Sequence, residues 1–140
     1  MAAALWWGSL SGLAFVIVPL LFRRMATPAE AGALAAQLFS AQTWVTAASC
    51  ILLLLMVSRP DDPAMVAQAR AVSGLAIAGL LLALLVEFGV AQKIVSARSE
   101  GGNLRLWHGI GSAMYFAQWL CAGLAVWRLG RRDLQLADVT

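Results

Sequence analysis

Leu80-Leu-Leu-Ala-Leu-Leu-Val86 and Ile51-Leu-Leu-Leu-Leu-Met56 are unbroken apolar runs in a chain of 140 residues. They lie in two of four long apolar stretches, at residues 5–22, 29–57, 65–94 and 104–127. A helix needs about 20 apolar residues to cross a bilayer, so each stretch is long enough, or nearly so, to span one. The strands of a membrane barrel would instead alternate apolar and polar residues. The sequence therefore predicts an all-α, polytopic membrane protein.

The composition agrees with a location in the membrane. Hydrophobic residues make up 61% of the chain and charged residues 12%, whereas soluble domains carry about 25% charged residues. The basic residues lie at the ends of the apolar stretches, as they do in membrane proteins. A nucleic-acid-binding surface would gather them on one solvated face. We therefore expect the lipid bilayer as a partner and no nucleic acid.

The connections between the apolar stretches are short, which predicts one domain over residues 1–132 and a polar tail over 133–140. Short connections make successive helices antiparallel neighbours, so we expect an up-down-up-down bundle of four transmembrane helices. Pro19 should interrupt the regular hydrogen bonding of the first helix near Phe15.

Three helix starts can be read from capping residues. Thr27-Pro28-Ala29-Glu30 has the pattern of a capping box with proline at the first helical position. Asp62 followed by Pro63 is typical of a helix start, and Asn103 is a suitable N-cap for the last helix. These signals predict helices that begin near residues 28, 63 and 104.

Four spans place both chain termini on the same side of the membrane, here called side one; the opposite side is side two. The predicted bundle has five basic residues on each side. Those of side one are Arg59, Arg70, Arg128, Arg131 and Arg132, and those of side two are Arg23, Arg24, Lys93, Arg98 and Arg105. The positive-inside rule therefore leaves the orientation open. The basic residues before the tail favour termini in the cytoplasm, and Trp6, Trp7 and Trp127 on side one predict an aromatic belt.

The strongest candidate for chemistry is a polar site on side two. Glu87 is the only acid in the interior of a predicted span, since Glu30 lies at the start of its stretch, and His108 is the only histidine. Along their helices they lie about 9 Å inside Lys93 and about 7 Å inside Asn103, so they could meet at one depth. An ionisable residue inside a membrane is a functional hypothesis by default. The predicted site comprises His108, Glu87, Arg23, Gln37, Gln92 and Lys93, with His108 as a possible metal ligand.

The polar site has a structural alternative. Both ionisable side chains lie within two turns of a helix end, where they could contact Lys93, Arg105 or water and hold two helices together. Further polar residues are predicted to form hydrogen bonds between helices, although they could instead line a cavity. These residues are Gln42, Thr46, Ser49, Ser112 and Tyr115. Gly8 and Gly12 form a GxxxG motif, which is compatible equally with packing within the chain or with dimerisation.

Metal and haem ligation receive limited support from the residue types. Cys50 and Cys121 supply soft sulfur ligands that suit Cu(I), but such residues more often pack as small apolar side chains. A haem with two histidine ligands cannot form within one chain, because there is one histidine. No nucleotide-binding, zinc-protease or serine-hydrolase motif occurs, so we expect no enzyme activity of these kinds.

The order of short motifs resembles a known family. These motifs are Trp7-Gly8 with Gly12, Pro19-Leu-Leu-Phe-Arg23, Ala31-Gly32, Leu38-Phe39 and Leu106-Trp-His-Gly109. Together they resemble the bacterial four-helix membrane family of unknown function that is similar to transmembrane protein 205. That family is in turn similar to the copper-resistance-D (CopD-like) proteins and to haem-linked protoporphyrinogen oxidases. The resemblance implies a bundle in the bacterial inner membrane with a metal, haem or small-molecule role. The first helix lacks the histidine of the haem-linked enzymes, and only His108 matches their ligands.

Three functional hypotheses follow. The first is a small membrane protein that handles a metal ion, a proton or a small molecule through the polar site on side two. The second is a non-catalytic accessory or structural subunit that binds other membrane proteins or a second copy of itself. The third and weakest is a haem-dependent membrane oxidoreductase.

Overall fold

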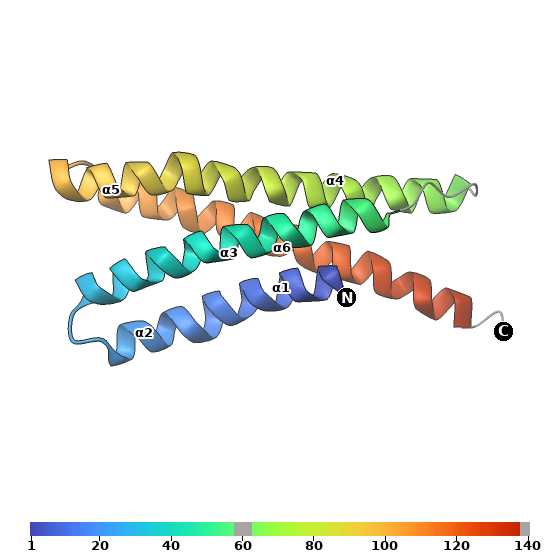
Figure 1. Cartoon of the computed structure of the whole chain (residues 1–140), viewed down its shortest axis with the longest axis horizontal. Helices are drawn as coiled ribbons and strands as arrows, with labels where there is room; N and C mark the ends of the chain where they lie inside the picture. Colours follow the sequence, from blue (N-terminus) through green and yellow to red (C-terminus); the bar gives the residue numbers. More distant parts are fainter. Residues whose placement is uncertain (58–62, 138–140) are drawn as a thin grey trace.

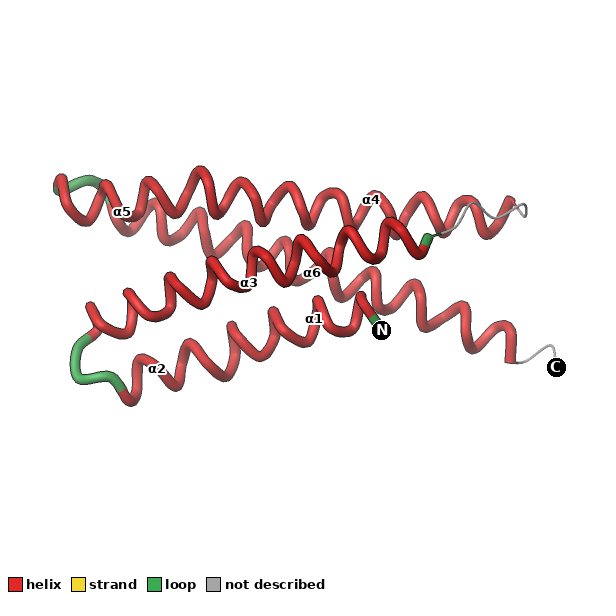
Figure 2. Tube along the Cα trace, in the orientation of Figure 1, coloured by secondary structure: helices red, strands yellow, loops and turns green. Residues whose placement is uncertain are grey.

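A computed structural model describes residues 1–57 and 63–137, and nearly all of them are helical (Figures 1 and 2). The elements in chain order are α1 (Ala2–Gly12), η1 (Leu13–Ile17), α2 (Val18–Arg24), α3 (Pro28–Met56), α4 (Pro63–Leu85), η2 (Val86–Val90), α5 (Ala91–Glu100) and α6 (Leu104–Ala137). The predicted cap at Asp62 lies outside the described residues. The helix α6 continues to Ala137, so the predicted polar tail begins within a helix.

These elements combine into four helices that are long and apolar enough to span a membrane. They cover Ala2–Arg24, Pro28–Met56, Val66–Arg98 and Leu104–Arg131. Each of the four predicted apolar stretches therefore corresponds to one of these helices. The segments from Arg70 to Lys93 and from Arg105 to Arg128 each cover about 35 Å at the rise of an α-helix, close to the thickness of the hydrocarbon core.

Two spans contain a wider, π-helical turn. The first, η1, directly precedes Val18 and Pro19, where the proline ring removes a donor and crowds the preceding turn. This confirms the predicted interruption near Phe15. The second, η2, contains Glu87 and Gly89 but no proline. Such turns are rare in proteins, and those that occur are often at functional sites, so η2 makes the region around Glu87 a candidate site.

The predicted caps at residues 27 and 103 are confirmed in the structure. Glu30 N donates to Thr27 Oγ1 at 3.2 Å, and Thr27 N donates to Glu30 Oε2 at 3.3 Å, which completes the capping box of α3. Leu106 N donates to Asn103 Oδ1 at 3.0 Å at the start of α6. Between α5 and α6 the chain reverses at Gly101, whose φ of 78° favours glycine.

The four spans pack most closely in their side-one half. There α1 contacts α3 and α6, and α4 contacts α3 and α6. The buried core includes Trp6, Leu10, Cys50, Leu53 and Ala76. Toward side two, α2 packs on α3 and α5 packs on α6, and Figure 1 shows these two pairs diverging. The bundle is thus closed at one end and spread at the other.

Two tryptophans of α1 are seated against glycines of other spans. Trp6 is fully buried over Gly79 of α4, and a Cβ at Gly79 would overlap Cζ2 and Cη2 of the indole ring. Trp7 lies over Gly123 of α6, where a Cβ would lie 3.0 Å from Trp7 Nε1. The prediction that Trp6 belongs to an aromatic belt is therefore wrong. The Trp6 indole ring fills the space on α4 that is left open because Gly79 has no side chain.

Candidate functional site

Glu87 joins the third span to the second through a hydrogen bond. Ser40 Oγ of α3 donates to Glu87 Oε1 of η2 at 2.5 Å, and both residues are half-buried. The carboxyl lies about 9 Å inside Lys93 along its helix, and Ser40 lies about 15 Å inside Glu30. Glu87 is thus the acid within the apolar part of the described spans, and its partner is a hydroxyl group rather than a cation.

A chain of polar side chains crosses the middle of the bundle. Gln42 Nε2 of α3 donates to Ser9 Oγ of α1 at 2.9 Å and lies 3.5 Å from Thr46 Oγ1. Thr46 Oγ1 donates to Gln118 Oε1 of α6 at 3.4 Å. All but Ser9 are buried. With the Glu87–Ser40 bond, each of the other three spans is connected directly to α3 by a side-chain hydrogen bond.

Gln42 tests the contribution of this polar chain to stability. Gln42→Leu keeps most of the side-chain volume but removes the donor to Ser9, so we expect a loss of about 0.6–1.7 kcal/mol in unfolding free energy. Unfolding in lipid bicelles would measure it. Gln37→Leu, an exposed glutamine of the same helix, is the matched control and should change stability little. Equal effects of the two changes would contradict a stabilising role for the polar chain.

The predicted helix-joining residues have different surroundings. Gln42 and Thr46 form the bonds described above. Ser49 Oγ and Tyr115 Oη are buried without a hydrogen-bond partner among the described residues, and the Tyr115 ring packs edge-on against Phe39 at 5.0 Å between centroids. Ser112 is exposed, contrary to the expectation of a contact between helices.

The residues of the predicted polar site do not gather around Glu87. His108, Arg23, Gln37, Gln92 and Lys93 are exposed, on four different spans. The structure gives no hydrogen bond or ion pair between any of them and Glu87 in its described part. His108 and Glu87 share the side-two half of the bundle, but the exposed imidazole lies on the surface of α6. The polar centre of this half is therefore the Glu87–Ser40 pair.

Sequence reasoning missed three members of these contacts: Ser9, Ser40 and Gln118. Gln118 carries the clearest signal, since it is an amide in the middle of an apolar stretch, where polar groups are costly without partners. Ser9 and Ser40 carry weak signals, because serine is common in membrane helices. Which serine meets which partner depends on how the helices are rotated and aligned.

The described residues contain no group of three histidine, cysteine, aspartate or glutamate side chains that could hold a metal ion. Cys50 is buried in the core, and Cys121 is half-buried beside it, both as free thiols. The atoms near Glu87 that could ligate a metal are hard oxygen atoms, whereas the sulfur atoms of Cys50 and Cys121 lie toward side one.

Four helices that are long and apolar enough to span a membrane, joined by polar side chains, are consistent with an integral membrane protein. The chain belongs to the family described as a domain of unknown function, DUF4149, whose model matches residues 1–103. The matched part contains α1 to α5 and both members of the Glu87–Ser40 pair. No curated protein and no solved structure matches the chain.

Proposed function

We propose that this protein takes up and releases a proton at Glu87 within the membrane, from the side-two half of the bundle. One observation carries the proposal: Glu87, the acid within the apolar part of the described spans, accepts a hydrogen bond from Ser40 on the neighbouring span. A carboxyl group at this depth is expensive in free energy and is typical of proton and ion pathways. The π-helical turn around Glu87 supports a specialised role for this position.

The chemistry of the Glu87–Ser40 pair suits a proton better than a metal ion or a small molecule. A carboxylate accepts a hydrogen bond from the Ser40 hydroxyl, and a protonated carboxyl can donate to the same oxygen. The hydrogen bond is therefore kept in both protonation states, with a rotation of the hydroxyl. A metal ion would need further ligands, and no third ligating group accompanies Glu87 among the described residues.

Several finer features complete the proposal. The four spans would cross the membrane in up-down-up-down order, with the termini in the cytoplasm of a bacterium and the bundle in its inner membrane. The exposed polar residues His108, Arg23, Gln37, Gln92 and Lys93 would form the side-two entrance. Kinship with transmembrane protein 205 and the copper-resistance-D proteins rests on the order of short motifs in α1, α3 and α6.

Proton flux into liposomes containing the purified protein, followed with an internal pH-sensitive dye under a potassium diffusion potential, tests the proposal. We expect Glu87→Gln to lower the flux by about 100-fold, because the amide cannot exchange a proton. Ser40→Ala keeps the carboxyl but removes its partner, so we expect an intermediate flux. The matched control is Glu30→Gln, which alters the acid at the membrane edge and keeps a side chain able to cap α3.

The outcome separates the proposal from its main alternative. Wild-type flux equal to that of empty liposomes, or equal fluxes for wild type and Glu87→Gln, would overturn the proton role.

The accessory-subunit hypothesis is favoured by four neighbouring aromatic rings on α1, η1 and α6. Trp119 lies 5.8 Å from Trp7, 5.9 Å from Phe15 and 5.7 Å from Phe116, measured between ring centroids. A fixed membrane partner retained in mild detergent and lost on Phe116→Ala would support that hypothesis.

A further inference from the structure

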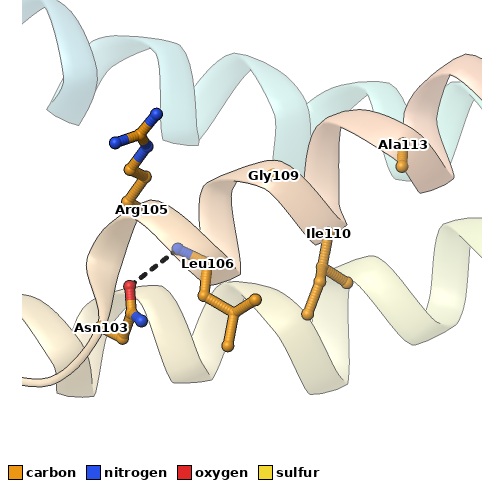
Figure 3. Close-up of a pocket in the computed structure, with 6 residues that line it drawn as sticks. All are labelled: Asn103, Arg105, Leu106, Gly109, Ile110 and Ala113. Atoms are coloured by element: carbon orange, nitrogen blue, oxygen red, sulfur yellow. Dashed lines mark hydrogen bonds between the residues drawn. The ribbon is translucent and has the colours of Figure 1, made fainter.

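A hollow of about 520 Å³ lies on α6 near its side-two end. It is lined by Asn103, Arg105, Leu106, Gly109, Ile110 and Ala113 (Figure 3). In Figure 3, Leu106 and Ile110 point away from Arg105, while Gly109 has no side chain and Ala113 has only a methyl group. The hollow therefore has a cationic rim at the membrane edge and an apolar floor that leads into the membrane.

The hollow faces away from the rest of the bundle. A Cβ at Gly109 would meet nothing within 4 Å, whereas one at Gly111 would lie 3.4 Å from Val90 at the contact with η2. Side chains that are two residues apart on a helix point to nearly opposite sides. Since Gly111 packs inward, the Gly109 surface is turned toward the surrounding lipid. An occupant would enter from the bilayer without any movement of the helices.

The charge at the rim has no ion-pair partner among the described side chains. Arg105 is exposed and forms no ion pair with a described side chain, and the same holds for Arg23, Arg24, Lys93 and Arg98 on this side. Arg105 also follows the start of α6, where backbone amides favour negative charge. The amide oxygen of Asn103 already accepts from Leu106 N. The rim therefore favours an anionic group that accepts hydrogen bonds.

We infer that this hollow is a binding site for an anionic phospholipid. Its phosphate contacts the Arg105 guanidinium, and one acyl chain lies over Gly109 and Ala113 alongside Leu106 and Ile110. Guanidinium groups suit phosphate through paired hydrogen bonds, and the floor offers apolar contact at the depth where an acyl chain begins. The site lies on a different surface from Glu87 and does not depend on its proposed role.

Native mass spectrometry of protein released from nanodiscs tests this site. The nanodiscs would contain phosphatidylcholine alone or phosphatidylcholine mixed with phosphatidylglycerol. We expect one retained phosphatidylglycerol on the wild type, and about fivefold lower occupancy for Arg105→Gln, because one basic contact is lost at the membrane surface. Gly109→Leu should reduce occupancy as well, since its side chain fills the hollow. Ala113→Leu serves the same purpose if Gly109→Leu does not fold.

Two matched controls make the result specific. Arg24→Gln removes another exposed side-two arginine, and Gly74→Leu enlarges an exposed glycine of α4 with open space around it. Both should keep the bound phosphatidylglycerol. Equal losses for Arg24→Gln and Arg105→Gln would overturn the site in favour of general attraction to basic residues. Displacement of the lipid by inorganic phosphate at a concentration equal to that of the lipid would also overturn it, because the acyl chain would then contribute nothing.

Discussion

Trp6→Ala is expected to lower the free energy of unfolding by about 3–5 kcal/mol, the range for removal of a fully buried large aromatic side chain. Trp6 has no exposed surface and lies in the core with Leu10, Cys50 and Ala76. Inside a bilayer, helices associate largely through close packing, and the cavity would leave its lining without contact atoms. Unfolding of the purified protein in lipid bicelles would measure the loss.

Trp44→Ala is the matched control for this change. Trp44 lies on α3 and is 62% exposed, so its removal takes away a ring that faces lipid. We expect little change in stability, because lipid chains replace most of the lost contacts. Trp6→Phe should lie between the two, since it keeps a ring and removes an indole N–H that has no hydrogen-bond partner in the described part of the chain. Similar losses for Trp6→Ala and Trp44→Ala would contradict the assignment of Trp6 to the core.

The features that sequence analysis predicted are those that depend on neighbouring residues along the chain. The four apolar stretches, the capping box of Thr27 and Glu30 and the cap at Asn103 each need only local geometry. The interruption before Pro19 belongs to the same class, because the proline ring acts on its own helix. Such signals give the number of spans and most of their ends.

Which residues meet at the candidate site depends on the rotation of each helix about its axis, and sequence periodicity does not reveal that rotation. A helix that is apolar on all sides gives little indication of which face turns inward. Depth alone therefore pairs Glu87 with His108, whereas the structure pairs it with Ser40 and leaves His108 exposed. Trp6 was assigned to the interface for the same reason, since tryptophan occurs both in belts and in cores.

Glycines show the same dependence on rotation. Gly8 and Gly12 form the GxxxG motif that stands out in the sequence, yet a Cβ at either position would meet nothing within 4 Å. Gly79 and Gly123 belong to no such motif, and they are the glycines that contact tryptophan rings. Close packing in this bundle therefore comes from single glycines opposite large rings, rather than from two helix backbones in contact.

Gly79→Ala should consequently destabilise the bundle by about 1–3 kcal/mol, although alanine is the better helix former. The added methyl group would overlap Cζ2 and Cη2 of Trp6, a rigid ring enclosed on all sides. Gly74→Ala, in the same helix with open space around it, should instead stabilise by up to about 1 kcal/mol. Unfolding in bicelles would resolve this difference in sign.

The double mutant identifies the cause of the loss. Trp6→Phe removes the ring atoms that Gly79→Ala would overlap, so we expect the glycine change to cost at least about 0.5 kcal/mol less in that background. A full loss in both backgrounds would mean that Gly79 is needed for a reason other than the Trp6 ring. A stabilising Gly79→Ala would mean that α1 and α4 do not approach as closely as the structure has them.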